Sequence, residues 1–538
     1  MSAIKQSFIK GTMILLVAGI VNRILGFVPR IWLPRVIGAE GMGLYQMGYP
    51  FLIVLLAMIT GGIPLAVAKL VAEADSAGDE RRVRRILRVS LTLSMGLGLS
   101  FMTASLFLSR WLTDKLFTDE RVYMTFLAMS PILVLVSVSA VYRGYFQGRR
   151  NMIPTAVSQL TETVFRIGGQ LILASALLPY GVEYAAAGAM AGVVIGEIGG
   201  MLALLRSYAR TKAAYAALPA SQRADGEESG HAGTAPAVKE PSRTESVWSR
   251  LIRIALPVTG GRIAGSASYF LESIAIVQSL AIAGVATSAA TAQYGMLQGM
   301  VIPLLLMPTA LTYSLSVSLV PSLSEAAARG DMRTIHKRLH QSMRLALVSG
   351  APFAVILFVL AEPLCYFLYQ NADAGHMLRM MSPVALLLYL QSPLQAALQA
   401  LDRPGTALIN TLIGAVVKLA LIYELASRPD WGIYGAITAI CVNIAFVTLL
   451  HWGSVARLLR FSLPPSDFFK VGAGMALMAG AVAVVMGEPW THSPALRFAA
   501  ACAAGAAVYL FCLFALKLVD REDFIRIPWL GPKLQRWL

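Results

Sequence analysis

Long apolar runs separated by short polar breaks occupy most of the 538-residue chain. A membrane-spanning helix needs about 20 mostly apolar residues, and the runs predict about fourteen such helices. Six lie before the middle of the chain, at roughly 9–36, 44–71, 89–112, 122–145, 153–178 and 184–207. Six more follow at roughly 252–283, 294–321, 343–369, 377–400, 406–425 and 433–458, with a final pair at 469–486 and 495–518. We therefore expect an all-α polytopic membrane protein.

One stretch near the middle, Ala209–Val247, interrupts this pattern. It mixes charged residues with Gly, Ser, Pro and Ala, and it has little apolar surface to bury. This composition predicts a flexible, largely disordered cytoplasmic linker. The expected domains are a first six-helix lobe (1–208), the linker (209–247), a second six-helix lobe (248–458), and an extra helix pair with a basic cytoplasmic tail (459–538).

The sequence before the linker recurs faintly after it, at a constant distance of 252 residues. The matched pairs include Glu73 and Glu325, Gly78 and Gly330, Asp79 and Asp331, Arg81 and Arg333, Gly43 and Gly295, Gln46 and Gln298, and Arg166 and Lys418. Most of these residues are charged, polar or Gly, so they indicate a duplicated half. Because each half has an even number of spans, the halves should form a parallel repeat about an axis along the membrane normal.

Composition and charge placement support the membrane class. Apolar residues make up 57% of the chain, charged residues 14%, and the mean hydropathy is +0.66. The net charge is +16, and its basic residues fall mostly in alternate short loops. That placement favours topology control and contact with anionic membrane lipids over nucleic acid binding. The positive-inside rule puts both termini, the linker and the basic loops in the cytoplasm.

Ionisable residues inside the predicted spans are candidate functional residues, since a charge within a bilayer is costly. The candidates are Asn22, Arg23, Arg30, Glu162, Arg166, Glu197, Arg262, Glu272 and Lys418. Arg23 and Arg30 are seven residues apart and should share a helix face. Glu162 and Arg166, four residues apart, could instead pair with each other. Cations outnumber anions, which favours a cavity for an anionic ligand.

The sequence contains no recognisable catalytic motif. It has no P-loop, no HExxH and no nucleophile elbow, and its six histidines are dispersed. Its four cysteines lack metal-like spacing and are best interpreted as buried small hydrophobic residues. We therefore expect no enzyme, no cofactor and no metal. The four-residue spacing of Gly188, Gly192, Gly196 and Gly200 predicts close helix packing.

Several segments resemble the family of stage V sporulation protein B. They are Lys10–Thr12, Asn22–Phe27 (NRILGF), Gly38–Tyr45 (GAEGMGLY), Gly62–Lys69 (GIPLAVAK), Arg143–Gly148 (RGYFQG) and Glu183–Gly188 (EYAAAG). The resemblance is dense in the first half and looser in the second. This family contains polysaccharide transporters of the multidrug/oligosaccharidyl-lipid/polysaccharide (MOP) exporter superfamily, to which the lipid II flippases also belong.

The resemblance implies a MATE-like fold of two six-helix lobes plus an extra pair, with a V-shaped cavity. It implies flipping of undecaprenyl-diphosphate-linked cell-wall precursors by alternating access in the bacterial cytoplasmic membrane or a forespore-associated membrane. Arg23 matches the cationic first-helix position of the family. In contrast to Gram-negative lipid II flippases, which carry basic residues after the proline of the second helix, Phe51–Leu55 follow Pro50 here. The resemblance therefore does not identify the lipid-linked sugar.

We expect Arg23, Arg30 and Arg262 to hold the diphosphate of the ligand in a cavity between the lobes, with Glu272 offsetting their charge. Glu162, Arg166, Lys418 and Asn22 are secondary candidates. Two alternatives stay open. A multidrug or toxin exporter would favour acidic cavity residues, and a non-transporting assembly factor in sporulation or cell-wall synthesis would instead recruit cell-wall synthesis proteins.

Overall fold

The computed structural model describes residues 8–216, 247–488 and 490–518. Every regular element within them is helical, which confirms the predicted all-α class. The chain divides into two compact units, Met1–Gly299 and Met300–Leu538. Most of the predicted linker lies outside the described residues, although α8 continues to Ala216, into the predicted linker.

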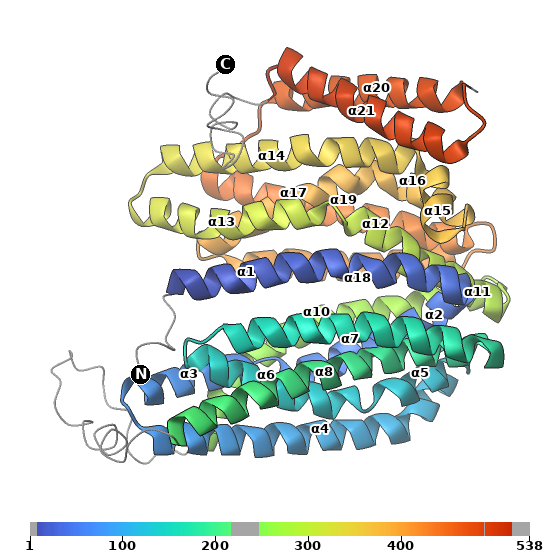
Figure 1. The fold of residues 1–538 in the computed structure, drawn as a ribbon. Coiled ribbons are helices and arrows are strands. Elements are labelled where there is room, and N and C mark those ends of the chain that lie inside the picture. Colours follow the sequence, from blue (N-terminus) through green and yellow to red (C-terminus); the bar gives the residue numbers. More distant parts are fainter. Residues whose placement is uncertain (1–7, 217–246, 489, 519–538) are drawn as a thin grey trace. The chain divides into compact units, whose positions relative to one another are not determined.

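The first unit begins with three helical segments that are broken at glycines. Its helices are α1 (Phe8–Leu25), α2 (Phe27–Thr60), α3 (Ile63–Ser76), α4 (Glu80–Leu116), α5 (Val122–Met129), α6 (Ile132–Gly148), α7 (Ile153–Leu177), the 3₁₀ turn η1 (Leu178–Tyr180), α8 (Val182–Ala216), α10 (Val247–Ile282) and α11 (Thr287–Met296) (Figure 1). Gly38 has φ 68° inside α2 and kinks it, a conformation that glycine adopts at little cost. This kink separates the first predicted span from the second.

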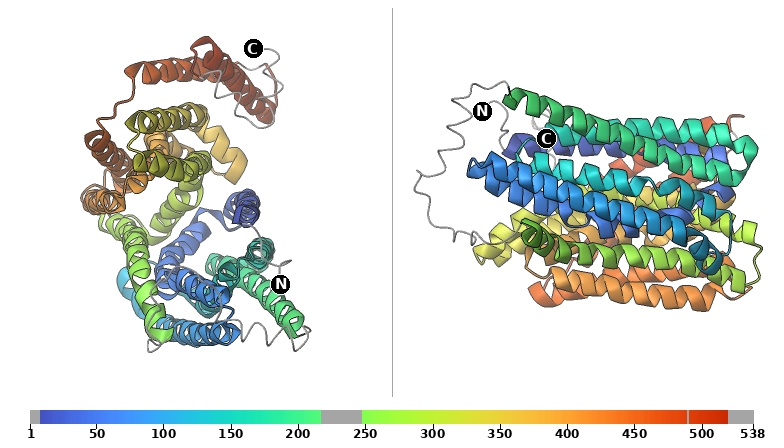
Figure 2. Two further views of the ribbon diagram at one scale, coloured as in Figure 1. Left: turned by 90° about the vertical axis from the view of Figure 1, so that its left-hand side faces the viewer. Right: turned by 90° about the horizontal axis from the view of Figure 1, so that it is seen from below.

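The second unit continues from α11 through a π-helical segment, η3 (Leu297–Val301). Its helices are α12 (Ile302–Leu306), α13 (Thr309–Ala328), α14 (Met332–Val359), α15 (Ala361–Tyr369), α16 (Asp373–Met381), the 3₁₀ turn η4 (Ser382–Val384), α17 (Ala385–Ala400), α18 (Pro404–Ala426), α19 (Gly432–Leu459), α20 (Pro465–Gly487) and α21 (Pro494–Ala515). α20 and α21 lie side by side (Figure 2), and Tyr509 Oη donates to the Val348 carbonyl of α14 at 2.8 Å.

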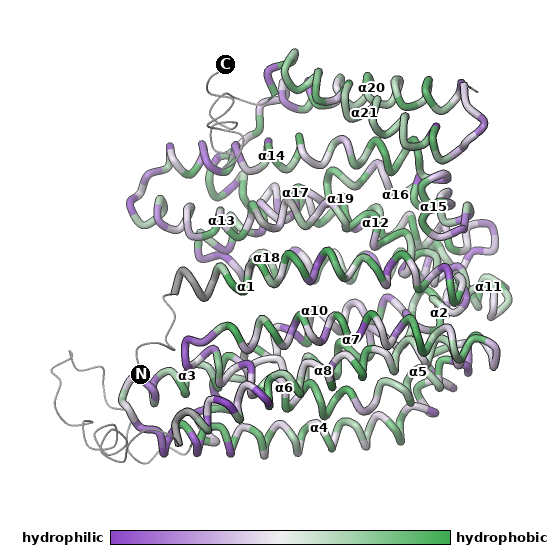
Figure 3. The backbone as a smooth tube through the Cα atoms, in the orientation of Figure 1, coloured by the Kyte–Doolittle hydropathy of each residue, from purple (hydrophilic) through white to green (hydrophobic). Residues whose placement is uncertain are grey.

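Among the described residues, twelve helical segments are long and apolar enough to cross a membrane. Their middles are largely hydrophobic, and α4 is hydrophilic where it begins (Figure 3). The count differs from fourteen for two reasons. The run Met13–Ser76 forms a single 64-residue segment although the predicted spans divide it in two. The predicted span 377–400 is divided into α16, η4 and α17, and each piece is shorter than a crossing.

The turns that join equivalent helices of the two units have the same backbone geometry. Gly78 has φ 71° and Gly330 has φ 69°. Each is followed by an aspartate that caps a helix, because Asp79 accepts from the Arg82 amide and Asp331 from the Thr334 amide. Further on, Arg150 and Asp402 have φ 55° and 56°. These residues lie 252 positions apart, as the sequence repeat predicts for duplicated turns.

Within the first unit, α2 and α11 touch through residues that are also 252 positions apart. A Cβ on Gly43 would lie 2.0 Å from the Thr291 carbonyl oxygen, and a Cβ on Gly295 would lie 2.0 Å from that of Ala39. Beside them, Gln46 Nε2 donates to the Gln298 carbonyl at 3.2 Å. The two helices can approach this closely because both contact positions are glycine. The helices α10 and α11 pack within the first unit although they follow the linker; the domain boundaries predicted from the repeat stay a prediction.

Candidate functional site in the first unit

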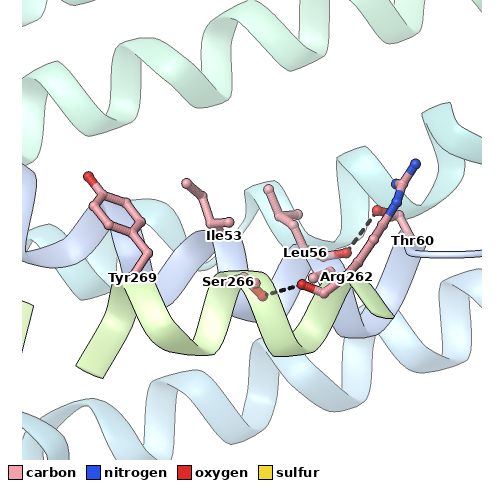
Figure 4. A pocket seen from close by; sticks show the side chains of 8 residues that line it. Ile53, Leu56, Thr60, Arg262, Ser266 and Tyr269 are labelled. Atoms are coloured by element: carbon pink, nitrogen blue, oxygen red, sulfur yellow. Dashed lines mark hydrogen bonds between the residues drawn. The ribbon is translucent and has the colours of Figure 1, made fainter. Parts of the chain in front are cut away.

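A pocket of about 500 Å³ lies between α2 and α10. It is lined by Ile53, Leu56, Ala57 and Thr60 of α2 and by Arg262, Gly265, Ser266 and Tyr269 of α10. Figure 4 shows Arg262 beside Thr60 at one end and Tyr269 at the other, with apolar side chains between them. Its volume is in the range of small-molecule sites. We call it the α2–α10 pocket.

The hydroxyl groups of this pocket are bonded to the backbone of their own helices. Thr60 Oγ1 donates to the Leu56 carbonyl at 2.8 Å, and Ser266 Oγ donates to the Arg262 carbonyl at 3.0 Å. Arg262 is the charged residue among the eight that line the pocket, and it is exposed. The pocket therefore combines an apolar wall with a guanidinium group, which suits a ligand that is anionic at one end and apolar along its length.

Glycines flank Arg262 along α10. A Cβ added at Gly260, Gly261 or Gly265 would meet nothing within 4 Å. Close helix packing therefore does not explain these glycines, in contrast to those of α8. Their effect is to leave the surface of α10 low on both sides of Arg262, so a bulky group can approach its guanidinium.

The face of α10 that carries Arg262 and Tyr269 continues to Glu272. Glu272 is 7% exposed and accepts a hydrogen bond from Gln298 Nε2 at 3.2 Å. Tyr269 is close enough to Glu272 and Arg30 for electrostatic interaction. The structure thus places three of the four main candidates, Arg30, Arg262 and Glu272, around Tyr269.

The remaining candidates of the first helix lie outside the lining of the pocket. Arg30 is exposed, with its guanidinium 5.9 Å from the centroid of the Phe27 ring. Arg23 is exposed in the last turn of α1. Asn22 Oδ1 is buried and accepts no hydrogen bond from the residues that the structure describes. In the second unit, Lys418 is half-buried on α18.

A second charged group joins α6, α7 and α8; we call it the acid–base cluster (Arg143, Glu162, Arg166 and Glu197). Glu162 receives Arg143 Nη2 at 2.8 Å and Arg166 Nη1 at 3.1 Å. Arg143 Nη2 also lies 3.9 Å from Glu197 Oε2. The pairing of Glu162 with Arg166, one of the two alternatives for these residues, is therefore confirmed, and Arg143 is an additional partner.

The glycines of α8 bring the acid–base cluster together. A Cβ on Gly196 would lie 2.6 Å from Cβ of Arg166, and one on Gly200 would lie 3.0 Å from Cβ of Glu162. The close packing predicted from the glycine spacing is confirmed, since α7 and α8 could not approach this closely with larger residues. Glu197 is thereby held next to Glu162.

Between the ends of α4 and α5, outside the membrane-long helices, Asp119 forms a third polar group. It is 3% exposed, pairs with Arg121 at 2.9 Å and accepts from Thr291 Oγ1 of α11 at 2.8 Å. Arg121 also pairs with Glu40 of α2 at 2.7 Å. Burial alone would raise the pKa of Asp119, but the hydrogen bonds from Arg121 and Thr291 outweigh it and lower the pKa below its ordinary value. This group ties α2 and α11 to the α4–α5 connection.

Sequence reasoning did not identify two of the residues that organise these sites. Arg143 belongs to a basic stretch at the end of a predicted span, so it resembles a loop residue; its position about one turn before the end of α6 lets it reach Glu162. Tyr269 gives no charge signal, although it lies seven residues after Arg262 on the same helix face. Among the described residues, no group of three or more His, Cys, Asp or Glu side chains could hold a metal.

Comparisons with known proteins agree with this architecture. Residues 8–327 match the family described as Polysaccharide biosynthesis protein, and residues 267–423 match MatE. Stage V sporulation protein B of Bacillus subtilis (strain 168) is 40% identical over 529 residues, covering 98% of this chain and 99% of the relative. Lipid II flippase MurJ of the same strain is 25% identical over 550 residues, covering 97% of this chain and 98% of the relative.

A solved structure of lipid II flippase MurJ in an inward closed conformation matches with a TM-score of 0.67 at 15% identity, covering 94% of this chain and 100% of that chain. The fold and the apolar helices define a polytopic membrane transporter of the MATE and MurJ type. The chain belongs to the stage V sporulation protein B-like branch of the polysaccharide biosynthesis proteins, within the MOP superfamily.

Proposed function

We propose that this transporter flips undecaprenyl-diphosphate-linked cell-wall precursors, peptidoglycan or polysaccharide, across the bacterial cytoplasmic membrane by alternating access. The names of two relatives support this substrate class, because one is a lipid II flippase and the other a sporulation protein. Spore cortex synthesis would be the setting if the function follows the second relative, in a forespore-associated membrane and with cell-wall synthesis proteins as partners.

The α2–α10 pocket is the observation that carries the proposal. A lipid diphosphate has two anionic phosphates on a long apolar chain. A guanidinium binds phosphate oxygens through a planar pair of N–H groups, and Arg262 offers one beside Ile53 and Leu56. Arg30 and Arg23 would add positive charge to the same route, and Glu272 would offset that charge when no ligand is bound.

We also propose the finer topology: fourteen spans, two six-helix lobes in a parallel repeat, and α20–α21 as an extra pair. A 64-residue run such as Met13–Ser76 is far longer than the about 20 residues that one crossing needs, and it bends at Gly38. With both termini cytoplasmic, cysteines introduced at Ser288 and Ser493 should react with an impermeant label from outside. Labelling of either only from inside would contradict the topology.

The test is flipping of a labelled undecaprenyl-diphosphate lipid in proteoliposomes, normalised to inserted protein. The unmodified protein should transport it. Arg262→Ala should lose about tenfold or more, since a hydrogen bond to a charged group contributes about 1.5–3 kcal/mol, and Arg262→Lys should lose less. The matched control is Arg253→Ala, at an exposed position of α10 outside the pocket lining, which should keep its transport rate.

A second variant tests the pocket without removing charge. Gly265→Leu should fold normally, because the space around a Cβ there is open, and it should block transport by filling the pocket. Gly96→Leu on α4, also in open space, is its control. Undiminished transport by both Arg262→Ala and Gly265→Leu would refute the site. Transport of cationic drugs but of no lipid diphosphate would refute the function in favour of a multidrug exporter.

A further inference from the structure

The two carboxyl groups of the acid–base cluster have different surroundings. Glu162 accepts hydrogen bonds from Arg143 at 2.8 Å and from Arg166 at 3.1 Å. The Glu197 side chain is 8% exposed, and its Oε2 accepts no hydrogen bond from the described residues. Its contact with Arg143, at 3.9 Å, is longer than a hydrogen bond. Glu162 therefore holds both guanidinium groups, and Glu197 is left with a weak share of one.

Glu197 and Glu162 also form a side-chain hydrogen bond with each other. An ionised carboxylate is only an acceptor, so a hydrogen bond between two carboxyl groups needs a proton on one of them. Without that proton, the two negative charges would repel each other in a partly dry site. Since the two arginines stabilise the charge on Glu162, the proton belongs on Glu197.

We propose that Glu197 is a proton-binding site of this chain, and that its proton is shared with Glu162 and exchanges with the aqueous phase. The ligand is a proton alone. Resting on the proposed transport function, we further infer that binding and release of this proton couple transport to a pH gradient across the membrane.

The groups that face Glu197 make the charge change simple to follow. Of the helices packed against α8, α7 contributes Glu162 and Arg166, α6 contributes Arg143, and α2 contributes Tyr45, which lies near Arg166. α5 and η1 contain no Asp, Glu, His, Lys or Arg. Two arginines and two ionised glutamates sum to zero, so one bound proton leaves the acid–base cluster with a single positive charge.

A metal cation would fit this site poorly. The oxygens of Glu162 already receive two guanidinium groups, at 2.8 Å and 3.1 Å, and a cation beside them would be repelled by both. A proton needs no such space, because it adds to a carboxylate oxygen and forms the hydrogen bond to Glu162. The same arginines that exclude a metal ion keep Glu162 ionised as the acceptor.

Loss of the proton would act on helix packing through Arg143. With Glu197 ionised, two carboxylates compete for the Arg143 guanidinium, which lies 2.8 Å from Glu162 and 3.9 Å from Glu197. Arg143 belongs to α6 and Glu197 to α8. Attraction between them would draw α6 toward α8, whereas the protonated state favours the contact of α6 with α7.

The first experiment measures the proton without any substrate. Infrared difference spectra of the full chain in lipid nanodiscs, recorded on a step from acid to alkaline pH, should show loss of a protonated-carboxyl band. Glu197→Gln should abolish that band while folding normally, because an amide can donate to Glu162 as the protonated acid does. Glu120→Gln, at an exposed loop position, is the control and should retain it. A band that persists in Glu197→Gln, or no band in the unmodified protein, would overturn the proposal.

The second experiment tests coupling in proteoliposomes. An imposed pH gradient should change the transport rate of the unmodified protein several-fold and leave that of Glu197→Gln unchanged. An equal response in both proteins would refute coupling through Glu197. The infrared result separates the two proposals, since a proton band without lipid transport would refute the proposed substrate, and lipid transport without the band would refute the proton site.

Discussion

The turns α3–α4 and α6–α7 of the first unit and α13–α14 and α17–α18 of the second have matching backbones but different side chains. In the first unit, Arg149 Nη1 pairs with Asp75 at 2.9 Å and with Glu80 at 2.5 Å. These contacts and burial act oppositely on Arg149: burial lowers its pKa, and the contacts with Glu80 and Asp75 outweigh that and raise it. The residues 252 positions further on are Ala327, Met332 and Leu401. Ala327 and Leu401 pack against the hydrophobic core of the second unit.

The difference shows that the ion set is separable from the turn. The glycine with positive φ and the capping aspartate are present in both units, so they define the backbone. The three charged residues are present together or replaced together. This agrees with the physics of buried ion pairs, because a pair can be exchanged for apolar residues as a whole, while removal of one partner strands a buried charge.

The helices next to these turns repeat the contrast deeper in each unit. The residue 252 positions after Arg143 is Gln395, whose Nε2 contacts His451 Nε2 at 3.2 Å. His451 Nδ1 contacts Asn410 Nδ2 at 3.2 Å, and Asn410 donates to Ser454 at 3.0 Å. The second unit thus packs the corresponding helices α17, α18 and α19 with neutral polar groups. The charges of the acid–base cluster are therefore not required for this helix arrangement, which favours a functional role for them.

The largest effect should come from breaking the ion set of the first unit. Arg149→Leu leaves Asp75 and Glu80 buried without their cation and should lower the free energy of unfolding by about 3–5 kcal/mol. Replacing all three with the residues of the second unit (Asp75→Ala, Glu80→Met and Arg149→Leu) should restore most of it. Unfolding of the purified protein in detergent measures both.

The control for that comparison is Arg329→Leu, which removes an exposed pair with Glu325 and should cost at most about 1 kcal/mol. A triple variant as unstable as Arg149→Leu alone would show that the ion set is needed for the first-unit turn.

A smaller effect should follow from Asp119→Asn, which introduces the residue type found 252 positions later, Asn371. The loss of charged hydrogen bonds with Arg121 and Thr291 should cost about 2 kcal/mol. The pKa of Asp119 is lowered by folding, so its stabilisation is complete above its ordinary value of about 4 and is lost as the pH falls through the folded value. The variant should lack this acid-dependent loss in thermal unfolding scans, whereas Asp114→Asn, at an exposed position, should retain it. Equal acid sensitivity of the Asp119 variant and the unmodified protein would contradict the assignment.

The smallest effect tests what the two units share. Asp79→Ala and Asp331→Ala each remove a helix-capping carboxylate, and each should cost about 1 kcal/mol. Because the two caps have the same geometry, the costs should be equal within error when each variant is unfolded under the same conditions. A clear inequality would mean that the surroundings of the turns, rather than the caps, determine their stability.

The sequence was sufficient for the helical membrane class because run length and loop charge are properties of each segment alone. It was insufficient where a segment contains internal breaks. Residues 377–400 form an apolar run, yet Ser382–Val384 adopt a 3₁₀ turn with Pro383 and divide it. Helix ends were also displaced, as at Val247, because polar residues continue a helix beyond the apolar run.

For the site, the sequence located the charges but not their partners. Glu272 was recognised as costly to bury, but its hydrogen bond to Gln298 depends on how α10 and α11 pack. Glu162 had a visible partner four residues away, whereas Arg143 reaches it from another helix, at a separation of 19 residues. Contacts within one helix follow from its periodicity; contacts between helices follow from packing, which a single sequence does not specify.

The contact between Gly43 and Gly295 has a consequence for the history of the chain. If the two halves arose by duplication and fusion, these glycines were once the same residue of a half-length ancestor. That residue would have met its own copy across a two-fold axis, so the ancestor would have been a homodimer. A side chain at this position would then have clashed with both protomers at once, since a Cβ on either glycine lies 2.0 Å from a carbonyl oxygen of the facing helix. Fusion allowed the rest of each half to diverge, but the two glycines still face each other and constrain each other.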